Sequence, residues 1–271
     1  MNENLLEVSN LTKCFDEAPV VSDVSFSVKS SETLGIVGES GSGKTTLVRC
    51  ILRAIDPDSG TILYNSQNGW REMQVLTNVD LIPLRREIQM VFQDPFSSLN
   101  PRMTISEILE EPLIIHGVGD KSSRRKLVLD MLAKVQLSKD TLTRFPHAFS
   151  GGQRQRIGIA RALMLRPKLV VCDESVSALD VSVQAQVINL LEDLQEELGL
   201  TYIFVAHDLS VIRHICDRVL VMRHGRVVEH GLVENVFSDP KEDYTKLLLS
   251  AIPSPDPDIR LRPEDRKRLV L

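Results

Sequence analysis

The residues with the clearest chemical meaning form a glycine-rich segment in the first fifth of the chain. A short apolar run, residues 34–37, leads into this segment, and apolar residues at helical spacing follow it. The segment fits the pattern G-x-x-x-x-G-K-[ST], in which backbone N–H groups wrap a phosphate, the lysine reaches the terminal phosphates and the hydroxyl residue holds magnesium. It therefore predicts a nucleoside triphosphate site with Mg²⁺, made of Gly38, Glu39, Ser40, Gly41, Ser42, Gly43, Lys44, Thr45 and Thr46.

Polar groups also follow two buried runs further along the chain. Asp173 and Glu174 come directly after the apolar residues 169–172, and His207 follows residues 203–206. Because ligands of parallel α/β sheets gather at the carboxyl ends of the strands, we expect these groups beside the glycine-rich loop. Asp173 is then the candidate for the magnesium, and Glu174 for orienting or deprotonating water. His207 would hydrogen-bond the γ-phosphate and fix that water, although a strand-end histidine can also be structural.

Two further candidates stand at the ends of predicted strands. Gln93 follows the predicted strand 87–92 and is the candidate for an outer magnesium contact and for sensing the nucleotide. Phe15 lies between the predicted antiparallel strands 5–11 and 20–28. Its ring could stack on a base, or it could simply belong to the core.

A second helix start also contains glycine. Ser150, Gly151, Gly152 and Gln153 precede a helix whose apolar side runs through residues 157–163. Serine and glycines at a helix start can form a second anion-binding end. A structural cap would account for Ser150, but not for two adjacent glycines.

Composition bounds the class of protein. The 271 residues are 42% hydrophobic and 25% charged, as in a soluble globular protein with one large domain, or one domain carrying an insertion. The net charge of −5 and the short, isolated basic clusters give no reason to expect a nucleic-acid partner. Four cysteines without any C-x-x-C pair predict small buried residues of a cytosolic protein.

Residues 1–4 lack the basic and apolar features of a secretory leader, and no run approaches the roughly 20 apolar residues of a spanning helix. We therefore expect a chain that is neither secreted nor membrane-spanning by itself.

Strands alternating with helices in the second half of the chain predict an α/β fold with a parallel sheet. Strands are expected at residues 61–64, 202–206 and 218–222, and helices at 209–215 and 244–250. An all-helical block at about 101–165 indicates an inserted subdomain. Residues 65–83 are polar and show no clean period, so we expect an irregular excursion, and the proline-rich residues 251–271 are expected to form a surface tail.

The order of these motifs resembles that of the ATP-binding cassette (ABC) ATPases. The resemblance covers residues 5–250 and includes the phosphate loop, Gln93, residues 150–153, residues 169–174 and His207, together with Ser177-Ala178-Leu179-Asp180. It implies a P-loop NTPase core with a parallel sheet, an antiparallel β subdomain and an inserted helical subdomain. It also implies a head-to-tail dimer in which residues 150–153 of one subunit close over the ATP held by the loop of the other.

The same resemblance gives roles to two residues whose function the spacing leaves open. It places Phe15 in the adenine-stacking position and Asp180 among the nucleotide-binding residues.

Two segments narrow the resemblance. Residues 92–101 and 244–253 are similar to the ATP-binding subunits of oligopeptide, dipeptide and nickel importers. This implies an ATPase subunit at the cytoplasmic face of a bacterial or archaeal membrane, coupling hydrolysis to uptake of a peptide or related small solute. Two such subunits, the same or paralogous, would drive two membrane-spanning permease subunits fed by an external solute-binding protein. The region near Gln93 and the helical insertion would form the groove for a cytosolic helix of the permease.

The alternative is a soluble ABC ATPase that serves a cytosolic enzyme complex, such as one that cleaves phosphonate C–P bonds. Three departures from the family pattern bear on both hypotheses: Ser175 replaces the usual proline, Phe149 replaces leucine, and Lys241-Glu242-Asp243 stands where His-Pro is common. None removes a group required for hydrolysis, so we expect an active site.

Overall fold

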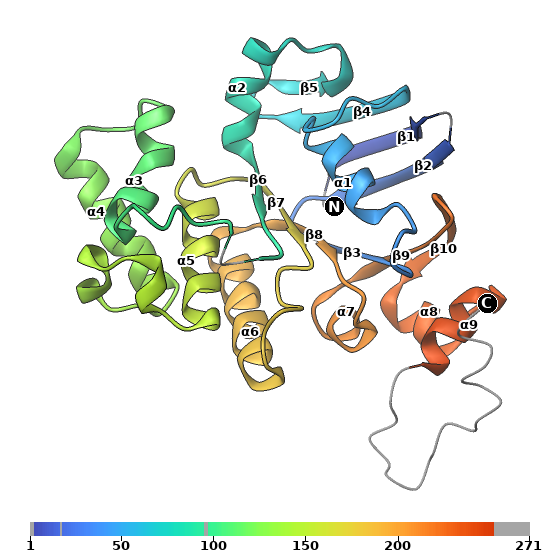
Figure 1. The fold of residues 1–271 in the computed structure, drawn as a ribbon. Coiled ribbons are helices and arrows are strands. Elements are labelled where there is room, and N and C mark those ends of the chain that lie inside the picture. The colour runs from blue at the N-terminus through green and yellow to red at the C-terminus, as the bar shows by residue number, and fades with distance from the viewer. Residues whose placement is uncertain (1–2, 17, 95–96, 252–271) are drawn as a thin grey trace, which may run out of the picture.

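The computed structural model describes residues 3–16, 18–94 and 97–251. Within these residues the strands form two sheets, one parallel in most of its pairings and one antiparallel (Figure 1). The larger sheet has the strand order β10-β9-β3-β8-β7-β6, and β10 pairs antiparallel with β9 at its edge. Its strands are β3 (Thr33–Val37), β6 (Ile88–Val91), β7 (Leu169–Asp173), β8 (Thr201–Val205), β9 (Arg218–Arg223) and β10 (Arg226–Leu232).

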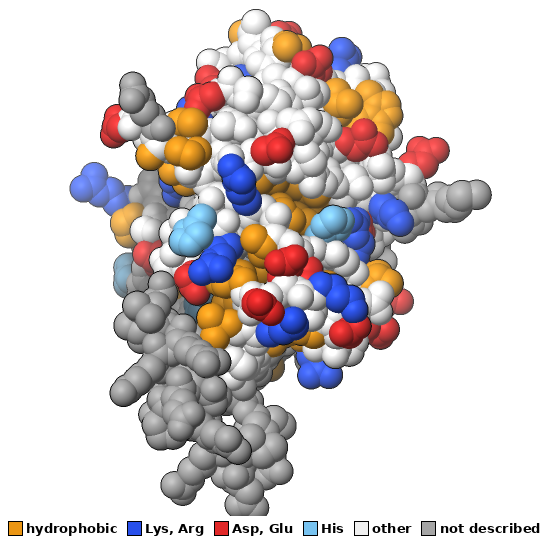
Figure 2. Space-filling view, turned by 90° about the vertical axis from the view of Figure 1, so that its right-hand side faces the viewer, with side chains coloured by type: hydrophobic (Ala, Val, Ile, Leu, Met, Phe, Trp, Pro, Cys, Tyr) orange, Lys and Arg blue, Asp and Glu red, His pale blue; other side chains and the backbone are white. Residues whose placement is uncertain are grey.

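The antiparallel sheet has the order β2-β1-β4-β5 and lies beside helix α1 (Lys44–Ile51) in Figure 1. Its strands are β1 (Asn4–Phe15), β2 (Ala18–Lys29), β4 (Ser59–Ser66) and β5 (Gly69–Glu72). The face of the molecule seen in Figure 2 carries acidic and basic side chains that are interspersed rather than gathered by sign.

Helices α5, α6 and α7 lie against the other side of the parallel sheet, and α3 and α4 lie beyond α5 (Figure 1). The bounds of these helices are α3 (Ile105–Ile115), α4 (Lys121–Lys134), α5 (Gly151–Leu163), α6 (Val181–Leu198) and α7 (Leu209–Ile215), and α8 (Val233–Ser238) and α9 (Asp243–Ser250) follow β10. Helix α2 (Asn78–Glu87) precedes β6, and short 3₁₀ turns lie at η1 (Met73–Val75), η2 (Lys139–Thr143) and η3 (Pro146–Ala148). In the part of the chain that the structure describes, no helix has the length and apolar character needed to cross a bilayer.

The parallel strands are continuous apolar runs because both of their faces are buried. Successive side chains of a strand point to opposite faces, so each strand contributes to two separate clusters. Ile203 and Val205 of β8 join the cluster that contains α1 and the antiparallel sheet. Tyr202 and Phe204 of the same strand join the cluster of the covering helices. The sheet is therefore fixed on both sides, and its carboxyl ends form a rigid edge.

The helical block predicted at 101–165 contains α3, α4 and α5. Each of these helices begins at a capping box, in which the side chain before the helix and the third helical residue bond each other's backbone N–H groups. The cap residues are Thr104, Asp120 and Ser150. The helices contact one another, and α5 also contacts β6 of the parallel sheet. The subdomain is thus joined to the edge of the sheet that carries Gln93.

Two expectations about local structure were wrong. Residues 65–83 are not irregular, because they contain β5, η1 and the start of α2. Helix α2 begins at a capping box of Thr77 and Asp80 and contains Pro83.

The second wrong expectation concerns a cysteine. Cys14 is half-buried rather than buried, whereas the other three cysteines are buried. The predicted tail, residues 251–271, lies outside the described residues except for Ala251.

Candidate functional site

The glycine-rich loop joins β3 to α1 at the carboxyl edge of the parallel sheet. Two of its glycines are required by both conformation and space. Gly38 has a φ of 149°, and a Cβ there would lie 2.2 Å from the carbonyl oxygen of Met222. Gly43 has a φ of 99°, and a Cβ there would lie 2.3 Å from the carbonyl oxygen of Val20. The loop is therefore pressed against neighbouring backbone on two sides, which fixes its shape.

Gly43 is also the N-cap of α1, and no side chain caps this helix. The first N–H groups of a helix have no partner within it, so this end is suited to an anion. The amine of Lys44 folds back over the loop, with its Nζ 2.7 Å from the carbonyl oxygens of both Gly38 and Glu39. Burial lowers the pKa of Lys44, and the carboxylates of Glu174, Asp173 and Glu39 oppose that shift.

A magnesium ion would have suitable donors next to this loop. The hydroxyl of Thr45 donates to Oδ1 of Asp173 at 3.4 Å, so a threonine from α1 and a carboxylate from the end of β7 already meet. Asp173 is buried, and burial followed by the nearby charge of Glu174 raises its pKa. A buried carboxylate beside a hydroxyl is an oxygen donor set that a divalent cation would stabilise. The residues therefore fit the ion that the loop pattern implies.

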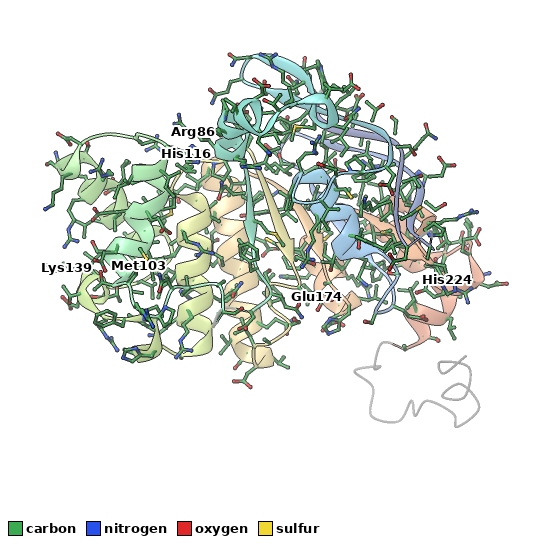
Figure 3. The ribbon with its side chains drawn as sticks, turned by 45° about the horizontal axis from the view of Figure 1, so that its top comes forward. Arg86, Met103, His116, Lys139, Glu174 and His224 are labelled. Carbon is green, nitrogen blue, oxygen red and sulfur yellow. The ribbon has the colours of Figure 1, made fainter. Side chains whose placement is uncertain are left out.

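Glu174 and His207, which are predicted to act on water, lie together with Gln93, the candidate for an outer magnesium contact and for sensing the nucleotide. Nε2 of Gln93 donates to Oε2 of Glu174 at 2.9 Å, and Nδ1 of His207 lies 3.7 Å from the same oxygen. These side chains follow three different parallel strands, β6, β7 and β8. Glu174 has a φ of 48°, a left-handed conformation that costs free energy outside glycine and is often retained at functional sites. In Figure 3, Glu174 lies where these strands end next to the loop.

A pocket of about 160 Å³ lies over the loop. Its lining contains Glu174 and most of the loop residues: Ser40, Gly41, Gly43, Lys44, Thr45 and Thr46. Val20 of β2 also lines it, which the sequence analysis did not foresee. Its place after Phe15 in a strand gave no chemical signal, because valine is an ordinary strand residue. A second pocket of about 170 Å³ adjoins Glu174 and His207 and includes Gln184 and Asp208.

Phe15 and Asp180 are not among the residues that line these two pockets. Phe15 ends β1 and is 45% exposed as a residue, and Nζ of Lys13 lies 5.5 Å from its ring centroid. Asp180 stands before α6, exposed and without a side-chain capping bond. Phe15 is accessible from solvent, and its stacking on a base remains a prediction.

The second glycine-containing segment is separate from the loop pocket. Ser150 accepts a bond from the N–H of Gln153 at 3.3 Å, and Oε1 of Gln153 accepts from the N–H of Ser150 at 3.1 Å. A Cβ on Gly152 would lie 2.3 Å from Cγ1 of Val183 in α6. Close packing thus explains one of the two glycines without any ligand. None of residues 150–153 lines the loop pocket.

Comparison with known proteins decides the family. The model described as "ABC transporter" matches residues 21–177. The chain belongs to the ABC transporter family. The resemblance identified from the motifs is thereby confirmed, and the chain is an ATPase cassette of this family.

Two curated relatives span nearly all of this ABC cassette. A putative peptide import ATP-binding protein of Brucella ovis is 50% identical over 260 residues, covering 94% of this chain and 81% of the relative. The oligopeptide transport ATP-binding protein OppF of Bacillus subtilis is 48% identical, covering 95% of this chain and 85% of the relative.

Solved ABC structures confirm the predicted fold class. The cbiO1 protein of Clostridium perfringens, part of the transporter complex cbiONQ, aligns with a TM-score of 0.78 at 28% identity, covering 88% of this chain and 92% of that one. The cassette MJ0796, solved as a dimer in a post-hydrolysis state with ADP and phosphate, aligns with a TM-score of 0.73 at 31% identity, covering 84% and 98%.

Proposed function

We propose that this cassette is the ATP-hydrolysing subunit of an importer, and that it couples ATP binding and hydrolysis to the uptake of a peptide or a related small solute. The observation that carries the ATPase part is the meeting of Gln93, Glu174 and His207 beside the phosphate loop. The importer part is supported by relatives that are named for peptide import and are about half identical along almost the whole chain. No relative reported above is named for a cytosolic enzyme complex, so the alternative is not favoured.

The residues divide the work of phosphoryl transfer to water. The loop N–H groups and Lys44 bind the phosphates and disperse charge that develops in the transition state. Oε2 of Glu174 accepts a proton from water or orients it, and Gln93 holds this carboxylate through its amide N–H. Nδ1 of His207 lies 3.7 Å from the same oxygen, and in this proposal His207 hydrogen-bonds the γ-phosphate. Thr45 and Asp173 would hold Mg²⁺, which neutralises phosphate charge when bound.

A second cassette is required to complete the site. Residues 150–153 lie outside the loop pocket of their own chain, and the helix start that they form is exposed at Ser150. The MJ0796 cassette, which was solved as a dimer with ADP and phosphate, supports a paired arrangement. We infer that residues 150–153 of one subunit, the same or a paralogous chain, close over ATP on the loop of the other, with Phe15 against the base.

A groove of about 610 Å³ offers a place for the permease. It lies between the α2 to β6 segment and the helical subdomain, and its lining includes Arg85, Phe92, Ser97, Glu111, Pro112 and Arg161. The lining is mixed, with apolar, basic and acidic side chains, which suits an amphipathic helix. Exposed apolar side chains, Ile82 on α2 and Ile115 on α3, lie on the helices that border it. We propose that two permease subunits hold the cassettes through such grooves at the cytoplasmic face of the membrane, with an external solute-binding protein delivering the solute.

Co-purification tests this function. Native complexes carrying the cassette should contain two polytopic membrane proteins, and recovery of a soluble enzyme core instead would support the alternative.

A variant of the groove tests where the permease binds. Ser97→Trp should fill the groove from an exposed position and remove the membrane proteins, while ATP binding persists. Ser122→Trp, on an exposed part of α4 outside the groove, is the matched control. Equal retention of the permease by both variants would contradict the groove assignment.

A further inference from the structure

A side chain from the far end of the chain is bonded to the phosphate loop. The hydroxyl oxygen of Tyr244, in α9, accepts a hydrogen bond from the backbone N–H of Glu39 at 3.1 Å. Glu39 is the second residue of the loop, 205 positions away in sequence. Tyr244 does not line the loop pocket, so its contact with the loop lies outside the space proposed for the nucleotide.

The position of Tyr244 is fixed from several sides. Tyr244 is 5% exposed as a residue and belongs to the larger core cluster, and the guanidinium of Arg223 lies 4.8 Å from the ring centroid. The start of α9 is held by Glu229 of β10, whose carboxylate accepts from the N–H groups of Lys241 at 2.8 Å and Glu242 at 3.1 Å. The hydroxyl is therefore presented to the loop by a helix that is itself anchored on the sheet.

The two peptide groups of Glu39 have different partners. Its carbonyl oxygen accepts from Nζ of Lys44 at 2.7 Å, whereas its N–H donates to Tyr244. Lys44 is also the residue that reaches the phosphates, so its three donors are shared between the loop and the nucleotide. Tyr244 keeps its bond whichever way the amine is directed. Together with the N–H of Ser42, which donates to the Glu39 carbonyl at 3.2 Å, it therefore holds this turn of the loop when Lys44 engages phosphate, and it is the contact that comes from outside the loop.

A second contact from the same part of the chain holds the other half of the loop. The N–H of Gly225, in the turn between β9 and β10, donates to the carbonyl oxygen of Ser42 at 3.0 Å. Figure 3 marks this turn at His224, across the loop from Glu174. The loop therefore rests on the β9–β10 turn and on α9 together.

We propose that Tyr244 is a positioning residue, through which the C-terminal helix α9 sets the conformation of the phosphate loop and hence the affinity for ATP. The inference rests on the loop as the nucleotide site. Because coupling between two sites is reciprocal, ATP binding should tighten the docking of α9 by the same factor. The C-terminal helix thereby becomes a place from which nucleotide affinity can be altered without contact with the nucleotide.

Tyr244→Phe tests the proposal, since it keeps the ring in the core and removes only the hydroxyl. The dissociation constant for ATP should rise about 3- to 10-fold, the range expected for losing one hydrogen bond. The turnover number at saturating ATP should stay within about twofold, because Gln93, Glu174 and His207 are untouched. The matched control is Tyr202→Phe, which loses a buried hydroxyl bonded to the carbonyl of Leu191 at 3.1 Å. That control should bind ATP like the parent.

Hydrogen exchange gives the structural readout. The Glu39 amide should exchange faster in Tyr244→Phe than in the parent, and ATP should protect the amides of α9 less in the variant. Glu229→Ala gives a second route, because it loosens the start of α9 without changing the ring, and it should also weaken ATP binding.

A parental dissociation constant in both Tyr244→Phe and Glu229→Ala would overturn the proposal, as would an unchanged Glu39 exchange rate or an equal loss in Tyr202→Phe. If the parent chain itself bound no ATP, the assignment of the loop would fail instead.

Discussion

Helices α1 and α5 both begin at glycine-containing segments that the sequence marks as anion sites, yet the two starts differ. Helix α1 begins at left-handed Gly43 with no side-chain cap, so its first N–H groups are left for a phosphate. Helix α5 begins at Ser150 with a complete capping box, so the N–H of Gln153 already has an acceptor within the chain. The α1 start therefore has backbone donors without a side-chain acceptor, whereas the α5 start is capped by its own residues.

The largest expected effect concerns hydrolysis beside α1. Glu174→Gln keeps the shape of the side chain but cannot accept a proton, so the hydrolysis rate should fall about 100- to 10,000-fold. Binding of ATP, measured by titration calorimetry, should change little, since the Glu174 carboxylate donates no hydrogen bond to phosphate. The control is Glu192→Gln, which alters another glutamate near a histidine, at 3.6 Å from Nε2 of His214. Hydrolysis by Glu174→Gln at the parental rate would remove this residue from the mechanism.

The next effect concerns the affinity for ATP, which should depend on the start of α1. Lys44→Ala should weaken ATP binding by roughly 10- to 150-fold, the loss expected for hydrogen bonds from a charged amine. A titration with ATP measures it, and Lys168→Ala, at a half-exposed lysine paired with Glu87, serves as the control. Unchanged affinity in Lys44→Ala would show that the start of α1 is not the phosphate site.

Gly152 tests whether packing explains a glycine in the α5 start. Gly152→Ala would bring a Cβ to 2.3 Å from Cγ1 of Val183, and such overpacking costs about 1–3 kcal/mol of the free energy of unfolding. Denaturant unfolding of the single chain measures this. Adding Val183→Ala should restore most of the loss by making room. If the double variant is no more stable than Gly152→Ala, the contact with α6 is not the reason for this glycine.

The smallest effect concerns the cap itself. Ser150→Ala should lower the free energy of unfolding by about 1 kcal/mol, because the N–H of Gln153 loses its acceptor. ATP binding to a single chain should not change, in contrast to Lys44→Ala. A loss of ATP affinity in the isolated Ser150→Ala chain would mean that the α5 start contributes to the nucleotide site of its own subunit.

Much of the fold and site was predictable because strong physical signals coincide. The continuous apolar runs before Gly38, Asp173 and His207 are strands buried on both faces, so their carboxyl ends had to share one edge. This alone predicted that Glu174 and His207 would meet, as they do. The residues of the loop could be read from glycine and lysine spacing, since each has a separate physical requirement.

The remainder depended on tertiary context. Helix α2 buries only Leu81 and Leu84 and contains Pro83, so its helical period is too weak to recognise. Strand β10 is an edge strand of half-exposed and exposed residues, paired antiparallel with β9. The bond from Glu39 to Tyr244 joins positions that no local pattern relates. Sequence patterns of this kind do not report contacts between distant segments.

The most direct test of the account is to measure particle mass and ATP hydrolysis in the same sample, by sedimentation of the cassette with ATP and Mg²⁺. The account predicts that the hydrolysing particle contains two cassettes and that a variant with Arg at position 150, Ser150→Arg, remains single and inactive although it binds ATP. Single chains that hydrolyse ATP at the full rate would contradict a site completed by a second cassette.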